Sequence, residues 1–96
     1  MILLLMLIYT DLMVKVIISP EADREIGRMP RAIQIRFLGV AERLQKWPDV
    51  SGAKPLRREL KGLFRIRTGD YRIVFRPVGE TLLIVRIDHR KDVYED

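Results

Sequence analysis

The sequence predicts an α+β fold in which an N-terminal strand and a two-helix hairpin precede a three-stranded antiparallel meander packed on the helices. A short β-branched run comes first, and two stretches with apolar residues at helical spacing follow it. The C-terminal half then alternates apolar and basic residues between turn signals. At 96 residues the chain has the size of one small domain with one core. Its 48% hydrophobic and 32% charged residues exclude a disordered chain.

The first strand and the first helix are expected between residues 13 and 30. The run MVKVII at 13–18 is short and rich in β-branched residues, which favours a strand. Ser19 can cap the following helix, Pro20 suits its first position, and acidic residues in its first turn suit the positive end of the helix dipole. Apolar residues then recur at helical spacing: Ala22, Ile26 and Met29.

A second helix is predicted between two prolines. Pro30 can open it, and the Trp47-Pro48 pair ends it. The apolar residues of this stretch fall on one side of a helix and need a sheet to cover them. They are Ile33, Phe37, Val40 or Ala41, and Leu44.

The sheet begins after an expected loop at 48–55 and a short connecting stretch around Leu56 and Leu60. In the strand LFRIRT, apolar residues alternate with Arg65 and Arg67, so the apolar pair should face the helices and the arginine pair solvent.

Two turns divide the rest of the chain into strands. The first is the Thr-Gly-Asp turn, where Gly69 is free to adopt a positive φ, and the second is PVGE at 77–80. Residues 82–85 are apolar on both faces, which indicates a central or largely covered strand.

The first twelve residues contain an apolar run at 2–8 that is far shorter than the roughly 20 residues needed to span a bilayer. The first charge is the negative Asp11, which does not fit a signal peptide. We therefore expect no membrane segment, and we divide the chain into an apolar leader, 1–12, and one domain, 13–96. The leader fits either an additional buried or intersubunit strand or a start codon placed too early, with Met13 as the natural start.

The full chain has a formal net charge of +5, and its positive charge is concentrated in one quarter of the sequence. Residues 54–76 hold eight Lys or Arg and two acidic residues, a net of +6, which leaves ten basic and eleven acidic residues, a net of −1, elsewhere. Such a surface indicates a polyanionic partner, either nucleic acid or an acidic protein segment. A solvated strand face is the structural alternative.

The cysteine and histidine counts limit the chemistry. No cysteine is present, which excludes disulfides and thiolate metal sites and favours a reducing cytoplasm. A single histidine argues against a zinc site, so we expect no metal and no other cofactor.

The segment LKGLFRIRTGDYRIVF at 60–75, followed by LLIVRIDHRKDVY at 82–94, resembles the RelE/ParE superfamily of bacterial and archaeal toxins, specifically its RelE side. With SPEADREI and the helical hairpin, the resemblance covers 13–95. It implies the toxin of a type II toxin–antitoxin system, an endoribonuclease (mRNA interferase) that cuts messenger RNA, in RelE relatives typically in the ribosomal A site. It also implies that a cognate antitoxin holds the protein inactive.

The resemblance implies roles for individual residues. Arg65 and Arg67 match a basic-x-basic pair that is commonly lysine in the family. Arginine grips phosphate bidentately, but a guanidinium stays protonated at neutral pH and is therefore a poor general base. Arg72 matches the family's arginine in the Tyr-Arg pair and is assigned to transition-state charge.

In the last strand, Arg90 matches a second catalytic arginine, and Tyr94 matches a tyrosine that stacks on or orients a base. Lys61 or His89 is left to remove the proton, and His89 has the only side chain that normally titrates near pH 7. The expected catalytic set is Arg65, Arg67, Arg72, His89, Arg90 and Tyr94. The expected RNA-binding set is Lys54, Arg57, Arg58, Lys61, Arg76 and Arg86.

Several of these positions also have structural interpretations. Tyr71 suits sheet packing, because aromatic residues in strands are usually structural. His89 suits a surface turn. Arg86 can pair with Asp88 or Asp70 as an ordinary surface salt bridge.

Two other classes of function stay open at this point. The first is a ParE-like inhibitor of DNA gyrase on the same fold, in which the basic sheet does no chemistry. The second is a non-catalytic RNA-binding module. The expected partners are an antitoxin with an acidic or amphipathic segment that folds on binding, in a hetero-oligomer, and messenger RNA on the ribosome.

Overall fold

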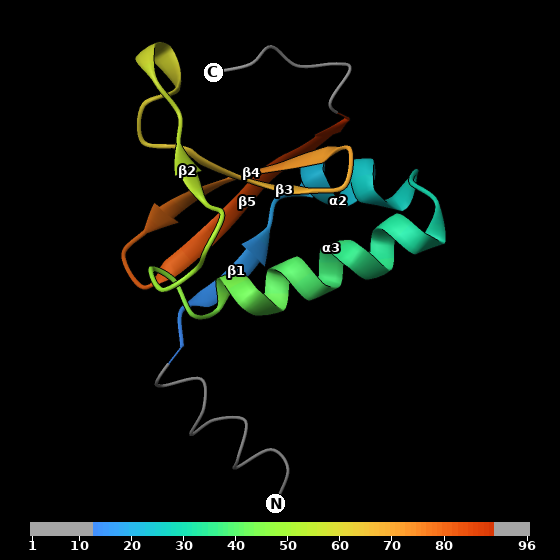
Figure 1. Cartoon of the computed structure of the whole chain (residues 1–96), viewed down its shortest axis with the longest axis horizontal. Helices are drawn as coiled ribbons and strands as arrows, with labels where there is room; N and C mark the ends of the chain where they lie inside the picture. The colour runs from blue at the N-terminus through green and yellow to red at the C-terminus, as the bar shows by residue number, and fades with distance from the viewer. Residues whose placement is uncertain (1–12, 90–96) are drawn as a thin grey trace, which may run out of the picture.

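In the computed structural model, which describes residues 13–89, two helices pack on one face of a five-stranded sheet (Figure 1). The sheet order is β1-β5-β4-β3-β2, so β5 is an interior strand that lies between β1 and β4. This confirms the predicted α+β class. None of the helices in this described part is long and apolar enough to cross a membrane.

Strand β1 (Lys15–Ile18) runs parallel to β5, and helix α2 (Pro20–Gly27) follows it directly. The predicted cap is confirmed, because the Ala22 N–H donates to Ser19 Oγ at 3.1 Å. Pro20 occupies the first turn, with Glu21 and Asp23 beside it. Ala22 is the residue of α2 that is fully buried.

Helix α3 (Arg31–Leu44) begins directly after Pro30 and ends before Trp47-Pro48, as predicted. Its buried side chains are Phe37, Val40 and Leu44, whereas Ile33 and Ala41 are half-buried. The apolar stripe therefore faces the sheet, and the helix ends where its burial ends.

Strands β3 (Phe64–Thr68), β4 (Tyr71–Val78) and β5 (Thr81–His89) form the predicted antiparallel meander. Gly69 and Gly79 both have positive φ in the connecting turns, at 59° and 61°. The prediction that residues 82–85 lie in a central or largely covered strand is also confirmed, since β1 and β4 flank β5.

The expected loop at 48–55 is wrong at its end, where Lys54–Pro55 forms the two-residue strand β2 paired with β3. The sheet therefore has five strands and not four. Two residues are too few for an alternating pattern to appear in the sequence, and a proline is tolerated because β2 is an edge strand. The 3-10 helix η1 (Arg58–Leu60) follows.

The core lies between the helices and one face of the sheet. Trp47 packs edge-on against Phe64 and Phe75, with ring centroids 4.8 and 5.2 Å away. The buried core cluster is Ala22, Phe37, Val40, Leu44, Ile66, Ile73, Phe75, Leu82, Ile84 and Ile87. Side chains at alternate strand positions point to the opposite face, which is therefore free to carry charge.

Candidate functional site

Two rows of charged side chains cross the face of the sheet that points away from the helices. In the first row, Arg67 of β3 lies opposite Arg72 of β4, which lies opposite Asp88 of β5. Directly paired strand residues have their Cβ atoms roughly 5 Å apart. The row therefore brings two predicted arginines and one carboxylate together.

The second row runs parallel to the first. Lys54 of β2 lies opposite Arg65 of β3, which lies opposite Val74, which lies opposite Arg86 of β5. Arg67 is exposed, whereas Arg65 is half-buried, so the expectation that both face solvent holds fully only for Arg67.

A β-bulge in β5 places the last members of both rows on this face. Val74 pairs with Arg86 but Phe75 pairs with Ile84, so Val85 is the additional residue. Without it, the alternation that buries Leu82 and Ile84 would continue and turn the next two even-numbered residues toward the helices.

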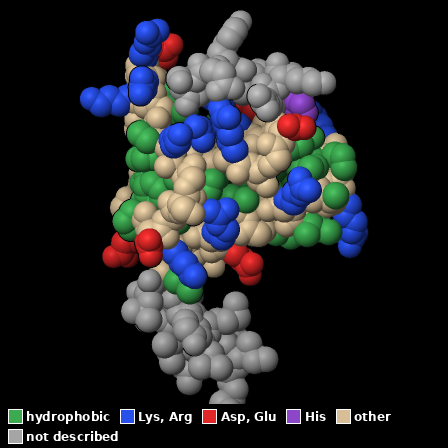
Figure 2. Space-filling model, in the orientation of Figure 1, with side chains coloured by type: hydrophobic (Ala, Val, Ile, Leu, Met, Phe, Trp, Pro, Cys, Tyr) green, Lys and Arg blue, Asp and Glu red, His purple; other side chains and the backbone are tan. Residues whose placement is uncertain are grey.

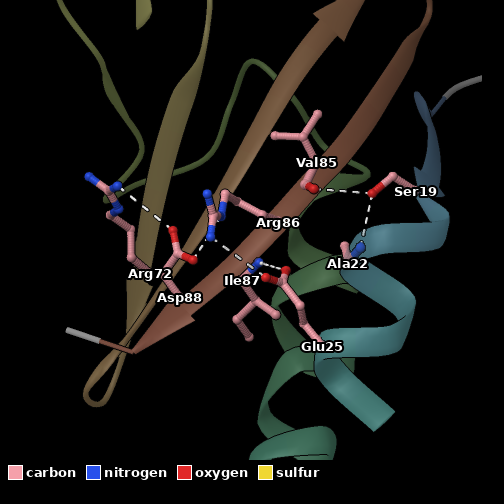
Figure 3. Close-up of polar contacts among 8 residues, drawn as sticks. All are labelled: Ser19, Ala22, Glu25, Arg72, Val85, Arg86, Ile87 and Asp88. Atoms are coloured by element: carbon pink, nitrogen blue, oxygen red, sulfur yellow. Dashed lines mark hydrogen bonds and ion pairs between the residues drawn. The ribbon is translucent and has the colours of Figure 1, made fainter. Parts of the chain in front are cut away.

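Asp88 lies between two arginines (Figure 3). Its Oδ1 is 2.8 Å from Arg86 Nε, and its Oδ2 is 3.8 Å from Arg72 Nη2. The side chains of Asp88 and Arg72 are only 5% and 12% exposed. The sequence left Arg86 two possible salt-bridge partners, Asp88 and Asp70. The structure has the pair with Asp88, whose side chain is buried.

Helix α2 supports this part of β5 from the side. Strand β1 pairs with β5 only as far as Ile84, so the edge of β5 has no strand beside it after this residue. There, Ser19 Oγ donates to the Val85 carbonyl at 3.1 Å. Glu25 Oε1 accepts the Ile87 N–H at 3.0 Å, and Glu25 Oε2 is 3.8 Å from Arg86 Nη2. The exposed backbone groups of an edge are thus satisfied by side chains from α2.

His89 lies on the other side of the sheet from the arginine rows. It pairs with Tyr71 across β4 and β5, and their rings meet edge-on at 5.0 Å. Tyr71 packs against the core, which agrees with its structural interpretation. Both residues share their face with Ile73 and Ile87 by strand alternation. The predicted residues Arg90 and Tyr94, like the leader 1–12, lie outside the described residues.

Most of the other predicted RNA-binding residues lie on a segment that stands out from the sheet on the side away from α2 (Figure 1). We call residues 54–62 the basic arm. Its base is closed by the Leu56 N–H, which donates to the Leu63 carbonyl at 2.9 Å. Figure 2 shows Lys and Arg side chains gathered on it. They belong to the exposed residues Lys54, Arg57, Arg58 and Lys61.

Arg76, the last predicted RNA-binding residue, is exposed on β4 and lies opposite Leu83. It shares the face of Arg72, two pleats along the strand. In residues 13–89, no group of three or more His, Cys, Asp or Glu side chains is arranged to hold a metal ion.

Sequence reasoning named Asp88 only as a possible surface partner of Arg86, and it missed Glu25. The signal for Asp88 was its place near the end of the strand that pairs with the Tyr-Arg strand, but the bulge that turns it toward Arg72 leaves no mark on the apolar pattern. Glu25 is one acid among several in an acidic helix, so the sequence does not distinguish it.

Comparisons with known proteins agree on one family. Residues 16–94 match the family model described as the ParE toxin of the type II toxin–antitoxin system parDE. Toxin RelG of Mycobacterium tuberculosis is 54% identical over 78 residues, which are 79% of this chain and 90% of RelG. Toxin RelE3 of Methanocaldococcus jannaschii is 29% identical and covers 84% of this chain and 96% of RelE3.

A solved structure shares the fold. A chain of the toxin–antitoxin complex RelBE2 from Mycobacterium tuberculosis superposes with a TM-score of 0.71 and 34% identity. The match covers 81% of this chain and 99% of that one.

Proposed function

This chain belongs to the RelE/ParE superfamily of type II toxins, and we propose that it acts as an endoribonuclease that cleaves messenger RNA. The observation that carries the proposal is the row of Arg67 and Arg72 on adjacent strands, with Arg65 beside it. Guanidinium groups in this arrangement can grip the oxygens of one phosphate from two sides.

The proposed reaction needs no metal ion. The 2′-hydroxyl loses a proton and attacks the adjacent phosphorus in line, and the 5′-oxygen leaves with a proton. Negative charge builds on the phosphoryl oxygens in the transition state. We assign its stabilisation to Arg67, Arg72 and Arg90.

Proton transfer is assigned to residues other than these arginines. His89 lies at the end of β5, one residue before Arg90, and Lys61 lies on the basic arm. We propose Lys61 or His89 as the base and Tyr94 as the residue that stacks on the RNA base. Because His89 lies on the helix side of the sheet, it can act as the base only if the RNA passes around the end of β5.

The basic arm and the exposed arginines of the sheet are proposed to bind the RNA backbone. The two rows and Glu25 together hold five cations against two carboxylates, a net charge of +3: Lys54, Arg65, Arg67, Arg72 and Arg86 against Asp88 and Glu25. The rest of the arm adds Arg57, Arg58 and Lys61 against Glu59, a net charge of +2. A polyanion is the partner that this surface favours.

A cognate antitoxin is the proposed protein partner, because a relative of 34% identity was solved in a toxin–antitoxin complex. We propose that an acidic or amphipathic segment of the antitoxin covers the basic face and that the two proteins form a hetero-oligomer in the cytoplasm. The proposed RNA substrate is messenger RNA on the ribosome.

Expression in cells tests the proposal. Wild type and an Arg72→Ala, Arg90→Ala double mutant are induced, and messenger 5′ ends are mapped by primer extension. New in-frame cuts are expected with the wild type only. Cuts that persist in the double mutant would contradict the assignment of these arginines.

Inhibition of DNA gyrase is the second candidate, because the matching family model is described as a ParE toxin. In that case growth would stop without new messenger ends, and purified gyrase would lose supercoiling activity. The arginines would then be contacts and not catalysts.

A further inference from the structure

Asp88 is a buried negative charge in the arginine row (Figure 3). Its Oδ2 atom is shielded from solvent and accepts no hydrogen bond within the described part of the chain. A buried carboxylate is unfavourable unless cations compensate for it. Here the compensation comes from Arg86 at 2.8 Å and Arg72 at 3.8 Å.

Arg86 sets the orientation of the Asp88 carboxylate. The Arg86 Nε–H donates to Oδ1, and Arg86 is itself 3.8 Å from Glu25, whose other oxygen accepts the Ile87 N–H. A charge-assisted hydrogen bond of this length fixes the orientation of the carboxylate. Oδ2 is thereby directed at the Arg72 guanidinium.

The ion pair with Asp88 restricts the conformations of the Arg72 side chain. An arginine side chain has several rotatable bonds, and each one that is free in the enzyme must be ordered when phosphate binds. An ion pair in a site where the two side chains are 12% and 5% exposed is screened less than one at the surface.

Asp88 does not fit the role of the missing base. A 2′-hydroxyl would have to reach an oxygen that solvent does not reach. Any effect of Asp88 on RNA cleavage must therefore pass through a neighbour.

We propose that Asp88 is a positioning residue that holds the Arg72 guanidinium in place for the phosphate. Arg86 and Glu25 link it to α2. The inference rests on the proposed function, because it assumes that Arg72 contacts the RNA.

A double-mutant cycle tests the inference. Single-turnover RNA cleavage is measured for wild type, Asp88→Asn, Arg72→Ala and the double variant. Asp88→Asn is expected to lower the rate about 10- to 100-fold in the wild-type background, since a misplaced group can cost about 100-fold. In the Arg72→Ala background it is expected to have no further effect.

The matched control is Glu42→Gln, which removes an exposed carboxylate of α3 that lies outside this network. It is expected to leave the cleavage rate unchanged. Melting temperatures are recorded for all variants. If Asp88→Asn does not fold, Asp88→Glu, which moves the carboxylate by one methylene, takes its place in the same cycle.

A second readout does not depend on cleavage. The ¹⁵N NMR signal of Arg72 Nε–Hε, assigned by its absence in Arg72→Ala, is expected to shift in Asp88→Asn and to stay unchanged in Glu42→Gln. A full cleavage rate in Asp88→Asn, an additional loss in the Arg72→Ala background, or an unchanged signal would overturn the inference. A wild type that cleaves no RNA would instead overturn the proposed function, and the NMR signal alone would then decide whether Asp88 holds Arg72.

Discussion

Arg72 combines two properties that rarely occur together on a surface: it is largely shielded, and it lies opposite another arginine, Arg67. Like charges directly opposite on paired strands are destabilising, and a bound anion between them removes that cost. Asp88 offsets part of the charge from the β5 side. The arrangement therefore suits a residue whose position matters as much as its charge.

Replacing Arg72 by lysine keeps the charge and removes the planar fork. We expect RNA cleavage to fall about 100-fold, the usual cost of losing one donor to transition-state charge. Single-turnover cleavage measures the effect, and Arg28→Lys, at the C-terminal end of α2, is the control for the same exchange at an arginine away from the site. A Lys variant with the wild-type rate would show that point charge alone suffices.

Replacing His89 by phenylalanine keeps an aromatic ring against Tyr71 and removes the proton acceptor. If His89 is the base, cleavage should fall about 100-fold or more while the melting temperature stays the same. The Lys61→Gln variant is the comparison. A fall only in the lysine variant would transfer the role of the base to the arm.

At the scale of elements, the turn between β3 and β4 determines which charges meet. Gly69 and Asp70 form a tight connection, so residues 67 and 72 become partners. This pairing can be predicted from the sequence, because the turn signal lies directly between the two stretches in which apolar and charged residues alternate. The helices were predictable for the same reason, since Ser19, Pro20 and Pro48 are local signals.

Two other features could not be predicted, because their cause is not local. Strand β2 exists through its pairing with β3, and the bulge at Val85 exists through its fit to β4. The bulge turns Asp88 toward Arg72 and leaves His89 beside Tyr71 on the helix side. Alternation read from Leu82 onward would exchange these two positions.

Alanine at Gly69 is expected to destabilise the protein by about 1 kcal/mol, because a non-glycine residue with positive φ is strained. A Cβ there would also lie 2.9 Å from Arg36 Nη1, but this is the end of a flexible exposed side chain that can move. Gly79→Ala, which has a similar φ and nothing within 4 Å, is the control. Urea denaturation should give equal losses. A much larger loss at Gly69 would show that Arg36 is fixed against the turn.

At the scale of the whole molecule, the two faces of the sheet have separate tasks. One face joins the helices in the core, and the other presents arginines, with the basic arm projecting from the β2 edge. The stability of the fold and the charge of the surface can therefore vary independently. Replacing the exposed cations of the arm should change binding without changing the fold.

Removing three of the four cations of the arm is expected to make RNA binding less dependent on salt. For single strands each phosphate contact contributes about 0.7 to the slope of log K against log salt. The variant Arg57→Gln, Arg58→Asn, Lys61→Gln should lose about 2 from this slope; asparagine is chosen because Arg58 has a positive φ. The control replaces Lys15, Arg24 and Arg28 by glutamine. An equal loss in the control would mean that total charge, and not the arm, binds RNA.

The chemistry of the new RNA ends tests the central claim most directly. Purified protein is incubated with RNA, with and without programmed ribosomes, and the fragments are labelled at their 5′ ends by polynucleotide kinase without prior phosphatase treatment. Attack by the 2′-hydroxyl predicts 5′-hydroxyl ends that label at once and 2′,3′-cyclic phosphates opposite them. Ends that carry a 5′-phosphate, or intact RNA under both conditions, would contradict the account.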